Sequence, residues 1–236
     1  MYLHSAALYD LMHQSLDYES AANRVRQLIA DRYPGARSLL DVACGTGRHL
    51  ELLGVDLVVE GLDINAEMLN VARARCPTAV LHQADMRTFD LGRQFDVVTC
   101  LFGSIGYVES FDELVTTIRN LGKHVMPGGF IVVEPWLSPE RYRLGALTAH
   151  SANSEDVTVS WMYSAEIADG RSIFDIHHLV GSSDDVEHFV ERHSLALFTT
   201  EQYERAFRLA GLTSEFDEVG LFGYGMLIAK IDRMAI

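Results

Sequence analysis

The sequence predicts an α/β fold: a doubly wound, mostly parallel sheet of seven strands with an inserted antiparallel β cap. Through residues 1–135, near-continuous apolar runs alternate with segments of helical periodicity. Such runs are typical of parallel strands that helices cover on both faces. From residue 136 to about residue 198 the pattern changes to alternation of apolar and polar residues. That alternation is typical of antiparallel hairpins with one solvated face.

The parallel part begins with a helix at residues 20–33, which places four apolar side chains on one face and ends at Pro34-Gly35. The apolar runs that follow are short enough to be strands and are separated by helical or turn segments. Five strands are expected, at residues 38–43, 57–62, 79–83, 95–102 and 130–135.

Capping residues mark the helices between these strands. The chain turns helical from residue 46, and Asn65 can cap a helix that runs to residue 75. Ser110 with Glu113 forms a capping box for a helix that ends before residue 127. Thr199 with Gln202 forms another, for a helix that ends at residue 211.

The cap and the end of the chain supply the remaining strands. Residues 157–167 and 174–180 alternate, and turn residues at 169–170 and 182–185 interrupt them. Residues 212–219 and 224–231 are expected as the last two strands of the main sheet. We therefore expect one domain over residues 1–236. Its parts are a helical lid (1–35), a cofactor-binding core (36–135 and 199–236) and a substrate cap (136–198).

Composition excludes several classes of function. The 33 acidic residues outnumber the 19 Lys and Arg, and the net charge of -14 argues against a nucleic-acid partner. Solubility explains this charge more simply than steering of a cationic substrate. No apolar run is long enough to span a bilayer and no basic-then-apolar leader opens the chain, so we expect a cytoplasmic protein without a membrane partner.

Cysteine and histidine patterns do not indicate a metal site. Three cysteines without a C-x-x-C spacing are expected to be buried thiols. Four cap histidines could meet across facing strands, but strand surfaces often carry solvated histidine, so no metal is expected. These are His177, His178, His188 and His193. Hairpin edges need covering, which leaves a monomer and a homodimer as equal expectations.

The turn after the first strand, in LLDVACGTGRHL (residues 39–50), is the main functional signal. A phosphate-binding P-loop would need a lysine that this turn lacks. A dinucleotide site would need a third glycine where Leu50 stands. Asp41 at the strand end and the glycines at 45 and 47 instead suit close approach of a small ligand with an ammonium group.

Two more acids follow the next two strands. Asp63 lies 18 residues after Gly45, where a carboxylate can accept from both hydroxyls of a ribose. Asp85 follows the third strand, precedes Met86, and can accept from an exocyclic amine. Ligands of open α/β sheets bind at the carboxyl ends of the strands. These acids therefore predict a site for adenosine that carries a cationic amino-acid tail.

The residues around these acids carry a resemblance to a known family. DVACGTG (41–47), GLDINAEML (61–69), QADMR (83–87) and FDVVTCLF (95–102) resemble motifs of the class I, Rossmann-like S-adenosylmethionine-dependent methyltransferases. SIGY (104–107), VVEPW (132–136), LFTTEQYERAF (197–207) and ALYD (7–10) resemble the antibiotic-pathway amino-sugar N,N-dimethyltransferases of the desosamine and mycaminose type. The resemblance spans nearly the whole chain and is weak over residues 140–195.

The resemblance implies S-adenosyl-L-methionine as cofactor, S-adenosyl-L-homocysteine as product, and a small-molecule acceptor methylated at an amine nitrogen. It implies that the methionine part of the cofactor is bordered by Asp41, Ala43, Gly45 and Gly47. The nucleoside part is assigned to Asp63 at the ribose, Ile64 and Met86 on either side of the adenine with Met68 beside them, and Asp85 at the amine. The cofactor carboxylate and ammonium are assigned to Tyr9 and Tyr18, which fold over the cofactor, and to the Leu101 carbonyl.

The acceptor side is expected to involve Tyr107 as the proton-handling group, with Phe102, Trp136 and Tyr224 as substrate contacts. A histidine, either His150 or one of the cap histidines, is the alternative proton-handling group. Three positions depart from the sugar enzymes. Tyr107 stands where they carry histidine, Tyr224 replaces a basic residue between glycines, and a twin tryptophan is reduced to Trp136-Leu137. The second change removes the expected contact to a nucleotide-sugar pyrophosphate.

Other functions remain open from the residues alone. The same cofactor could serve methylation of oxygen or sulfur on a peptide-type or other secondary metabolite. The chain could also be a sensor that binds the cofactor without transfer, or an oxidoreductase that uses the same strand-turn-helix. Binding of S-adenosylhomocysteine without binding of NAD separates the last of these from the others.

Overall fold

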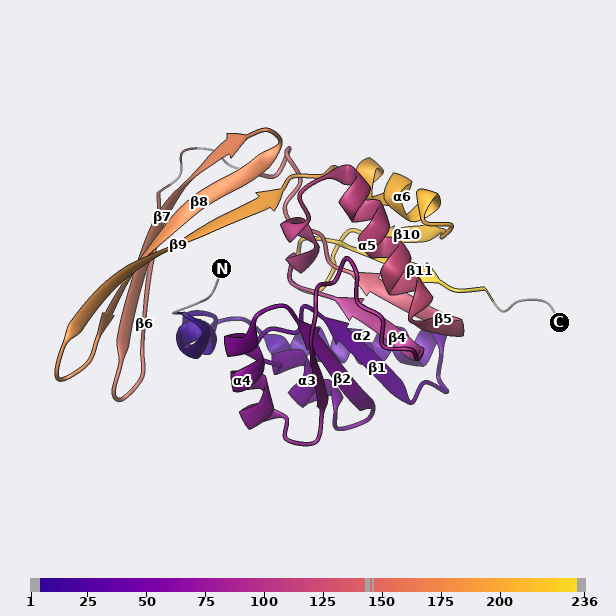
Figure 1. The fold of residues 1–236 in the computed structure, drawn as a ribbon, viewed down its shortest axis with the longest axis horizontal. Coiled ribbons are helices and arrows are strands. Elements are labelled where there is room, and N and C mark those ends of the chain that lie inside the picture. Colours follow the sequence, from indigo (N-terminus) through magenta and orange to yellow (C-terminus); the bar gives the residue numbers. More distant parts are fainter. Residues whose placement is uncertain (1–4, 143–144, 146, 233–236) are drawn as a thin grey trace.

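The computed structural model describes residues 5–142, 145 and 147–232. The ends of the predicted lid and core at 1–4 and 233–236, and residues 143–144 and 146 of the predicted cap, lie outside them. Two sheets make up the architecture (Figure 1). A seven-stranded sheet has the order β10-β11-β5-β4-β1-β2-β3, and a four-stranded sheet has the order β6-β7-β8-β9.

The seven-stranded sheet is mostly parallel, as predicted. Its strands are β1 (Ser38–Val42), β2 (Val58–Asp63), β3 (Val80–Gln83), β4 (Phe95–Cys100), β5 (Val125–Val133), β10 (Ser214–Asp217) and β11 (Met226–Lys230). The first five pair in parallel, and β11 pairs antiparallel with both β5 and β10. The carboxyl ends of β1 to β5 therefore meet at one edge of the sheet.

Helices cover both faces of this sheet. The main helices are α2 (Tyr18–Arg32), α3 (Arg48–Leu53), α4 (Ala66–Arg75), α5 (Phe111–Lys123) and α6 (Thr200–Leu209). Successive strand residues point to opposite sides. Leu39 packs in the cluster with α2 and α3, whereas Leu40 packs in the cluster with α5 and α6. Because both faces of the sheet are buried, consecutive residues of each strand are apolar in the sequence.

Several boundaries differ from the sequence-based expectation. Helix α2 begins at Tyr18, because the Asp17 side chain accepts from the Ser20 backbone N–H at 2.9 Å and caps it two residues earlier. Strand β5 begins at Val125 and runs through the Pro127-Gly128-Gly129 segment, which was expected to lie before the strand. A Cβ on Gly129 would lie 2.3 Å from the Asp96 carbonyl, so only glycine allows the two strands to approach.

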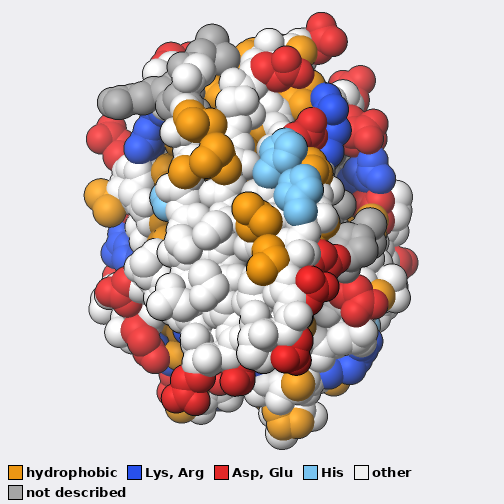
Figure 2. Space-filling view, turned by 90° about the vertical axis from the view of Figure 1, so that its left-hand side faces the viewer, with side chains coloured by type: hydrophobic (Ala, Val, Ile, Leu, Met, Phe, Trp, Pro, Cys, Tyr) orange, Lys and Arg blue, Asp and Glu red, His pale blue; other side chains and the backbone are white. Residues whose placement is uncertain are grey.

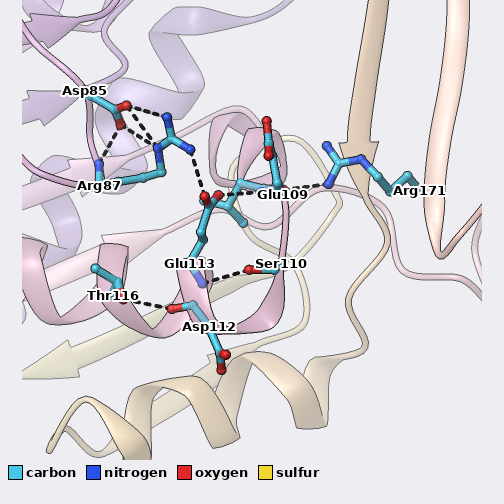
Figure 3. Close-up of polar contacts among 9 residues, drawn as sticks. Asp85, Arg87, Glu109, Ser110, Asp112, Glu113, Thr116 and Arg171 are labelled. Atoms are coloured by element: carbon cyan, nitrogen blue, oxygen red, sulfur yellow. Dashed lines mark hydrogen bonds and ion pairs between the residues drawn. The ribbon is translucent and has the colours of Figure 1, made fainter.

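The predicted caps are present, with one difference. Thr199 and Gln202 form the complete capping box of α6. Ser110 caps α5 by accepting from the Glu113 N–H at 3.2 Å. Glu113 does not complete that box, because its Oε2 accepts from the Glu109 N–H at 2.8 Å instead (Figure 3). That contact fixes the loop before α5.

The cap is an antiparallel meander of four strands: β6 (Leu147–Asn153), β7 (Thr158–Ala168), β8 (Arg171–Gly181) and β9 (Val186–Ala196). Strand β6 had no counterpart in the prediction. Asp169 and Gly170 both have positive φ, as a two-residue hairpin turn requires. Val159, Phe174 and Ile176 are buried on the inward face, which confirms the alternation expected from the sequence.

The outward face of the cap carries apolar and histidine side chains, which Figure 2 shows. Met162, Leu179 and Val190 are exposed there, and the rings of His177 and His188 stack at 5.4 Å. None of the helices in the described part of the chain is long and apolar enough to cross a bilayer. The choice between monomer and homodimer stays a prediction, as does a cytoplasmic location.

Candidate active site

A cavity of about 460 Å³ lies at the carboxyl edge of the seven-stranded sheet, beneath the inward face of the cap. Its floor comes from the turns after β1, β2 and β3, including Gly45, Asp63 and Asp85. Its opposite wall comes from the cap and includes Trp161, Tyr163, Phe174, Ile176 and Leu195. A small recess of about 40 Å³ adjoins the cavity and shares Tyr9, Ala43, Gly45 and Phe102 with it.

The turn after β1 is built from three residues in the left-handed region. Ala43 has φ 60°, Gly45 has φ 55° and Gly47 has φ 78°. A Cβ on Gly45 would meet nothing within 4 Å, so the backbone there borders open space. Gly47 lines neither the cavity nor the recess. It is the N-cap of α3 and packs against α4, where a Cβ would lie 3.2 Å from Ala72 Cβ.

Leu50, which replaces the third glycine of a dinucleotide site, is accommodated by a glycine on β2. A Cβ on Gly61 would lie 2.5 Å from Leu50 Cδ1. The close packing between helix and sheet is therefore kept with the glycine on the strand and the leucine on the helix, the reverse of the dinucleotide arrangement.

Asp41 lies at the end of β1 and lines the recess with a side chain that is 2% exposed. The hydroxyl of Thr99 donates to its Oδ1 at 2.7 Å. Burial, opposed by the Thr99 hydrogen bond and assisted by the charge of Asp63, raises the pKa of Asp41 to about 7. A buried carboxyl of this kind favours a cationic ligand, because a cation would stabilise its ionised form.

Asp63 is held at the end of β2 by backbone amides. Its Oδ2 accepts from the Gly45 N–H at 2.9 Å and its Oδ1 accepts from the Asn65 N–H at 2.8 Å. Burial raises the pKa of Asp63, and these hydrogen bonds oppose the shift. The Ile64 backbone amide is a third donor to this carboxylate, and a further lone pair is left for a ligand hydroxyl in the cavity.

Asp85 follows β3 and is paired with Arg87, a residue that sequence reasoning missed (Figure 3). Arg87 Nε lies 3.0 Å from both carboxylate oxygens, and Nη1 reaches Glu113 at 2.9 Å. The Arg87 side chain thereby lowers the pKa of Asp85 and keeps it ionised. Figure 3 shows the pairing as a chain that runs from the end of β3 to the start of α5.

An apolar slot lies between Asp63 and Asp85. Ile64 is 54% exposed, although it is a large aliphatic side chain at the cavity wall. Met86 and Met68 also line the cavity. Exposed aliphatic surface of this kind is available to the face of a planar ring.

The N-terminal segment closes one side of the site. It comprises η1 (Ala6–Leu8) and α1 (Tyr9–Met12). Tyr9 stacks on His13 with ring centroids 4.1 Å apart and lines both cavity and recess. Asp10 anchors the segment by accepting from the Thr46 hydroxyl at 2.7 Å and by pairing with Arg75.

The recess brings three predicted residues together. Tyr18, Asp41 and Leu101 all line it. The carbonyl of Leu101 accepts from the Ser104 N–H at 3.2 Å, at the start of η2 (Ser104–Tyr107). These contacts place an acid, a phenol and a backbone carbonyl around one small space.

On the acceptor side, the Tyr107 hydroxyl lies 2.8 Å from His193 Nδ1 on β9. Burial lowers the pKa of His193 to about 4, so the imidazole is neutral near pH 7. Trp136 lines the cavity and donates from Nε1 to the Ser172 hydroxyl at 3.1 Å. The predicted contacts Phe102 and Tyr224 also line it.

Glu134 at the end of β5 fixes two loops at once. Its Oε2 accepts from the Phe102 N–H at 2.8 Å, and its Oε1 accepts from the Leu221 and Phe222 N–H groups at 3.2 Å. It thereby orders the strained Phe102 backbone, at φ 53°, and the glycine-rich link that carries Tyr224. Its sequence signal was an acid at the end of a buried strand.

The four cap histidines separate by face. His177 and His188 meet on the outward side, with Nδ1 and Nε2 3.2 Å apart, while His178 and His193 point inward. Over residues 5–142, 145 and 147–232, no three metal-ligating side chains come together. The three cysteines are free and buried, as predicted.

Comparisons with known proteins agree with this geometry. Residues 39–129 match the methyltransferase domain family. The chain is 44% identical over 225 residues to a dTDP-3-amino-3,6-dideoxy-alpha-D-glucopyranose N,N-dimethyltransferase from Streptomyces fradiae, with 94% of this chain and 88% of that protein covered. The chain belongs to the amino-sugar N,N-dimethyltransferase family.

Solved structures of related methyltransferases share the whole fold. DesVI from Streptomyces venezuelae has a TM-score of 0.91 at 37% identity, covering 96% of this chain and 98% of its own. CalS10, an amino pentose methyltransferase from Micromonospora echinaspora solved with S-adenosylmethionine bound, has a TM-score of 0.85 at 34% identity over 98% and 97%.

S-adenosyl-L-methionine is the cofactor of this methyltransferase family, and the residues of this member fit it. The buried Asp41 carboxyl borders a recess with the dimensions of a small polar group. Asp63 is oriented by amides, and Ile64 offers exposed aliphatic surface beside it. Asp63 would suit the ribose of a dinucleotide as well, but the buried Asp41 carboxyl beside the first turn would repel a phosphate there and suits an ammonium group.

Proposed function

We propose that this methyltransferase N,N-dimethylates the amino group of a dTDP-linked amino sugar in antibiotic biosynthesis. The S. fradiae relative is named for that reaction on such a sugar. The observation that carries the proposal is the single cavity of about 460 Å³, in which cofactor-type acids on one side face an aromatic cap wall on the other. Because both sides line the same cavity, a cofactor and an acceptor bound to them would share one space.

Within this proposal, the cofactor is held along the carboxyl edge of the sheet. Asp41 and the Leu101 carbonyl take its ammonium, Asp63 its ribose hydroxyls, and Asp85 its adenine amine. Ala43 and Gly45 border its methionine part, and Gly47 supports that turn from behind. Ile64, Met68 and Met86 surround the adenine, and Tyr9 and Tyr18 bind the carboxylate.

Three parts of the chain have separate roles in this proposal: a lid, a cofactor-binding core and an acceptor wall. Residues 1–35 act as a lid that the Asp10 contacts to Thr46 and Arg75 hold against the core. Residues 36–135 and 199–236 bind the cofactor, and residues 136–198 form the acceptor wall. Phe102, Trp136 and Tyr224 lie where the acceptor would pass from the mouth to the floor of the cavity.

The bound cofactor supplies an activated methyl group, so the protein must align a neutral amine and exclude water. Tyr107 is the catalytic residue in this proposal. With His193 protonated at Nε2, the Tyr107 hydroxyl donates to Nδ1, and the hydroxyl oxygen is the atom that would accept from the substrate. An acceptor N–H can bind there, which turns the nitrogen lone pair toward the floor. His193 positions Tyr107 and stays neutral because burial lowers its pKa to about 4.

Incubation with methyl-labelled S-adenosylmethionine and dTDP-3-amino-3,6-dideoxyglucose tests the proposal. We expect mass spectrometry to show a product with two added methyl groups on nitrogen. A protein that binds S-adenosylhomocysteine but transfers nothing to this sugar contradicts the proposal. Label on oxygen or sulfur of another acceptor would favour the alternative methylation.

A further inference from the structure

The mouth of the cavity must accept the charged part of the substrate, and most arginines around it are already engaged. Among the residues that the structure describes, Arg87 is the one arginine or lysine in the cavity lining, and it is bound by Asp85 and Glu113. Arg171 donates to the Val108 carbonyl and to the hydroxyl and carbonyl of Ser194. Neither guanidinium is available to an anion.

Arg141 differs from both. It lies on the connection from β5 to the cap, and its guanidinium carbon is 5.8 Å from the centroid of the Tyr224 ring. Its Nη2 donates to the Gly223 carbonyl at 2.7 Å. Within the described residues it forms no ion pair with a carboxylate. Arg141 does not itself line the cavity, but Tyr224 does, so this cation lies next to a residue of the cavity wall.

The platform under Arg141 is rigid. Glu134 accepts from the Leu221 and Phe222 amides, and this fixes the link that leads to Tyr224. Gly225 has φ 82°, and a Cβ there would lie 2.4 Å from the Phe216 ring, so the link packs tightly against β10. The Arg141 guanidinium has five N–H donors, and its one hydrogen bond goes to a carbonyl. Several N–H groups are therefore left to bind a planar or tetrahedral anion.

We propose that Arg141, held on the ring of Tyr224, binds the diphosphate of a nucleoside-diphosphate sugar at the mouth of the cavity. The inference rests on the proposed function, because the acceptor must carry such a group. The chain has a net charge of -14, and Asp63, Asp85 and Glu109 line the cavity. An anionic substrate therefore needs a cationic side chain close to its charged group. A guanidinium suits a phosphate, because two of its N–H groups can donate to two phosphate oxygens at once.

Titration calorimetry on the full chain, saturated with S-adenosylhomocysteine, tests the site with dTDP, thymidine and inorganic pyrophosphate. We expect Arg141→Ala to weaken dTDP and pyrophosphate about tenfold to hundredfold and to leave thymidine unchanged. Arg141→Lys retains part of the affinity. Tyr224→Leu weakens dTDP as well, because the guanidinium loses its support. Raising the salt concentration weakens dTDP binding to the wild type more than to Arg141→Ala.

Arg205→Ala is the matched control, since Arg205 also stacks on an aromatic ring, 5.1 Å from the Phe111 centroid, but Phe111 does not line the cavity. We expect it to bind dTDP like the wild type. Affinity of Arg141→Ala for dTDP within twofold of the wild type overturns the Arg141 site alone, provided the wild type methylates the nucleotide sugar. A wild type that binds S-adenosylhomocysteine but neither binds dTDP nor methylates the nucleotide sugar overturns both proposals.

Discussion

The hydroxyl of Tyr107, on a loop of the core, lies 2.8 Å from Nδ1 of His193, on the last strand of the cap. This contact joins the cofactor-binding core to the acceptor wall at the level of the cavity. Phe174 stacks on His193 with ring centroids 5.4 Å apart and fixes the imidazole from the other side. The orientation of the Tyr107 hydroxyl therefore depends on the cap.

We expect Tyr107→Phe to lower kcat about tenfold to hundredfold with little change in KM, because the acceptor amine loses its orienting contact. His193→Phe should lower kcat less, since it removes only the partner of Tyr107. His177→Phe, on the outward face, serves as the control. Turnover rates of Tyr107→Phe that match the wild type from pH 6 to pH 9 would dismiss the role.

Cofactor affinity should depend on pH through Asp41. With the pKa of Asp41 raised to about 7 in the cofactor-free protein, a cationic ligand at that carboxyl must first displace a proton. We expect S-adenosylhomocysteine affinity to rise from pH 5 to about pH 7 and then to level off. Calorimetry in buffers of different ionisation enthalpy measures the proton released. Proton release that is the same in Asp41→Asn and in the wild type would contradict this.

The raised pKa of Asp41 should also make the free energy of unfolding of the cofactor-free protein depend on pH. This free energy should fall as the pH rises, whereas the cofactor affinity should increase. Because the folded-state pKa lies above the unfolded value near 3.8, the folded protein holds a proton that the unfolded chain releases. The contribution of Asp41 to the free energy of unfolding is therefore greatest below about pH 4 and is lost as pH rises to about 7. Asp41→Asn should stabilise the cofactor-free protein at pH 8 by on the order of 2 to 4 kcal/mol, measured by urea unfolding.

Asp63→Ala should lower S-adenosylhomocysteine affinity at least about a hundredfold, because a ribose would lose its carboxylate contact. The fold should persist with a loss of about 1 to 3 kcal/mol, since the Gly45 and Asn65 amides lose their acceptor. Circular dichroism and calorimetry measure the two effects. Asp56→Ala, which removes an exposed acid paired with Arg26, is the control. Unchanged affinity would show that the ribose contact is misplaced.

Gly61→Ala should destabilise the protein by about 1 to 3 kcal/mol, because its Cβ would lie 2.5 Å from Leu50 Cδ1, the nearest contact, and 2.8 Å from Cys44 Sγ and Leu81 Cδ2. Leu50→Ala alone should cost about 2 to 5 kcal/mol. The double variant should lose less stability than the sum of the losses in the two single variants, by at least about 1 kcal/mol. Leu121→Ala, in the core on the other face of the sheet, should combine additively with Gly61→Ala. Additive effects for the Leu50 pair would refute the contact.

The sequence predicted the features that depend on local order along the chain. The strand ends at Asp63 and Asp85 follow from apolar runs and caps, and parallel strands bring such ends to one edge. Arg87 and Glu134 were missed as site residues, because their partners come from other elements. His193 was named among the cap histidines but not as the partner of Tyr107. Tyr107 and His193 lie 86 residues apart, and no periodicity signals a contact of that kind.

Strand β6 and the start of strand β5 could not be predicted either, because their structure depends on pairing with other strands. Leu147–Asn153 has one buried residue, Ala152, so its apolar pattern is too weak to mark a strand, and pairing with β7 decides its structure. The glycines at 128 and 129 usually end a strand, but here the Gly128 N–H donates to the Ile231 carbonyl at 2.8 Å. In both cases, pairing with another part of the sheet determines the structure, although the local sequence has a low propensity to form a strand.

The two faces of the cap meander have a practical consequence for altering acceptor choice. Trp161 and Tyr163 on β7 and Phe174 and Ile176 on β8 line the cavity, whereas Met162, which lies between the first two, is exposed on the outward face. A combinatorial library that varies only alternate positions of β7 and β8 would therefore sample new acceptor shapes while the opposite surface, the strand register and the cofactor-binding core stay as they are.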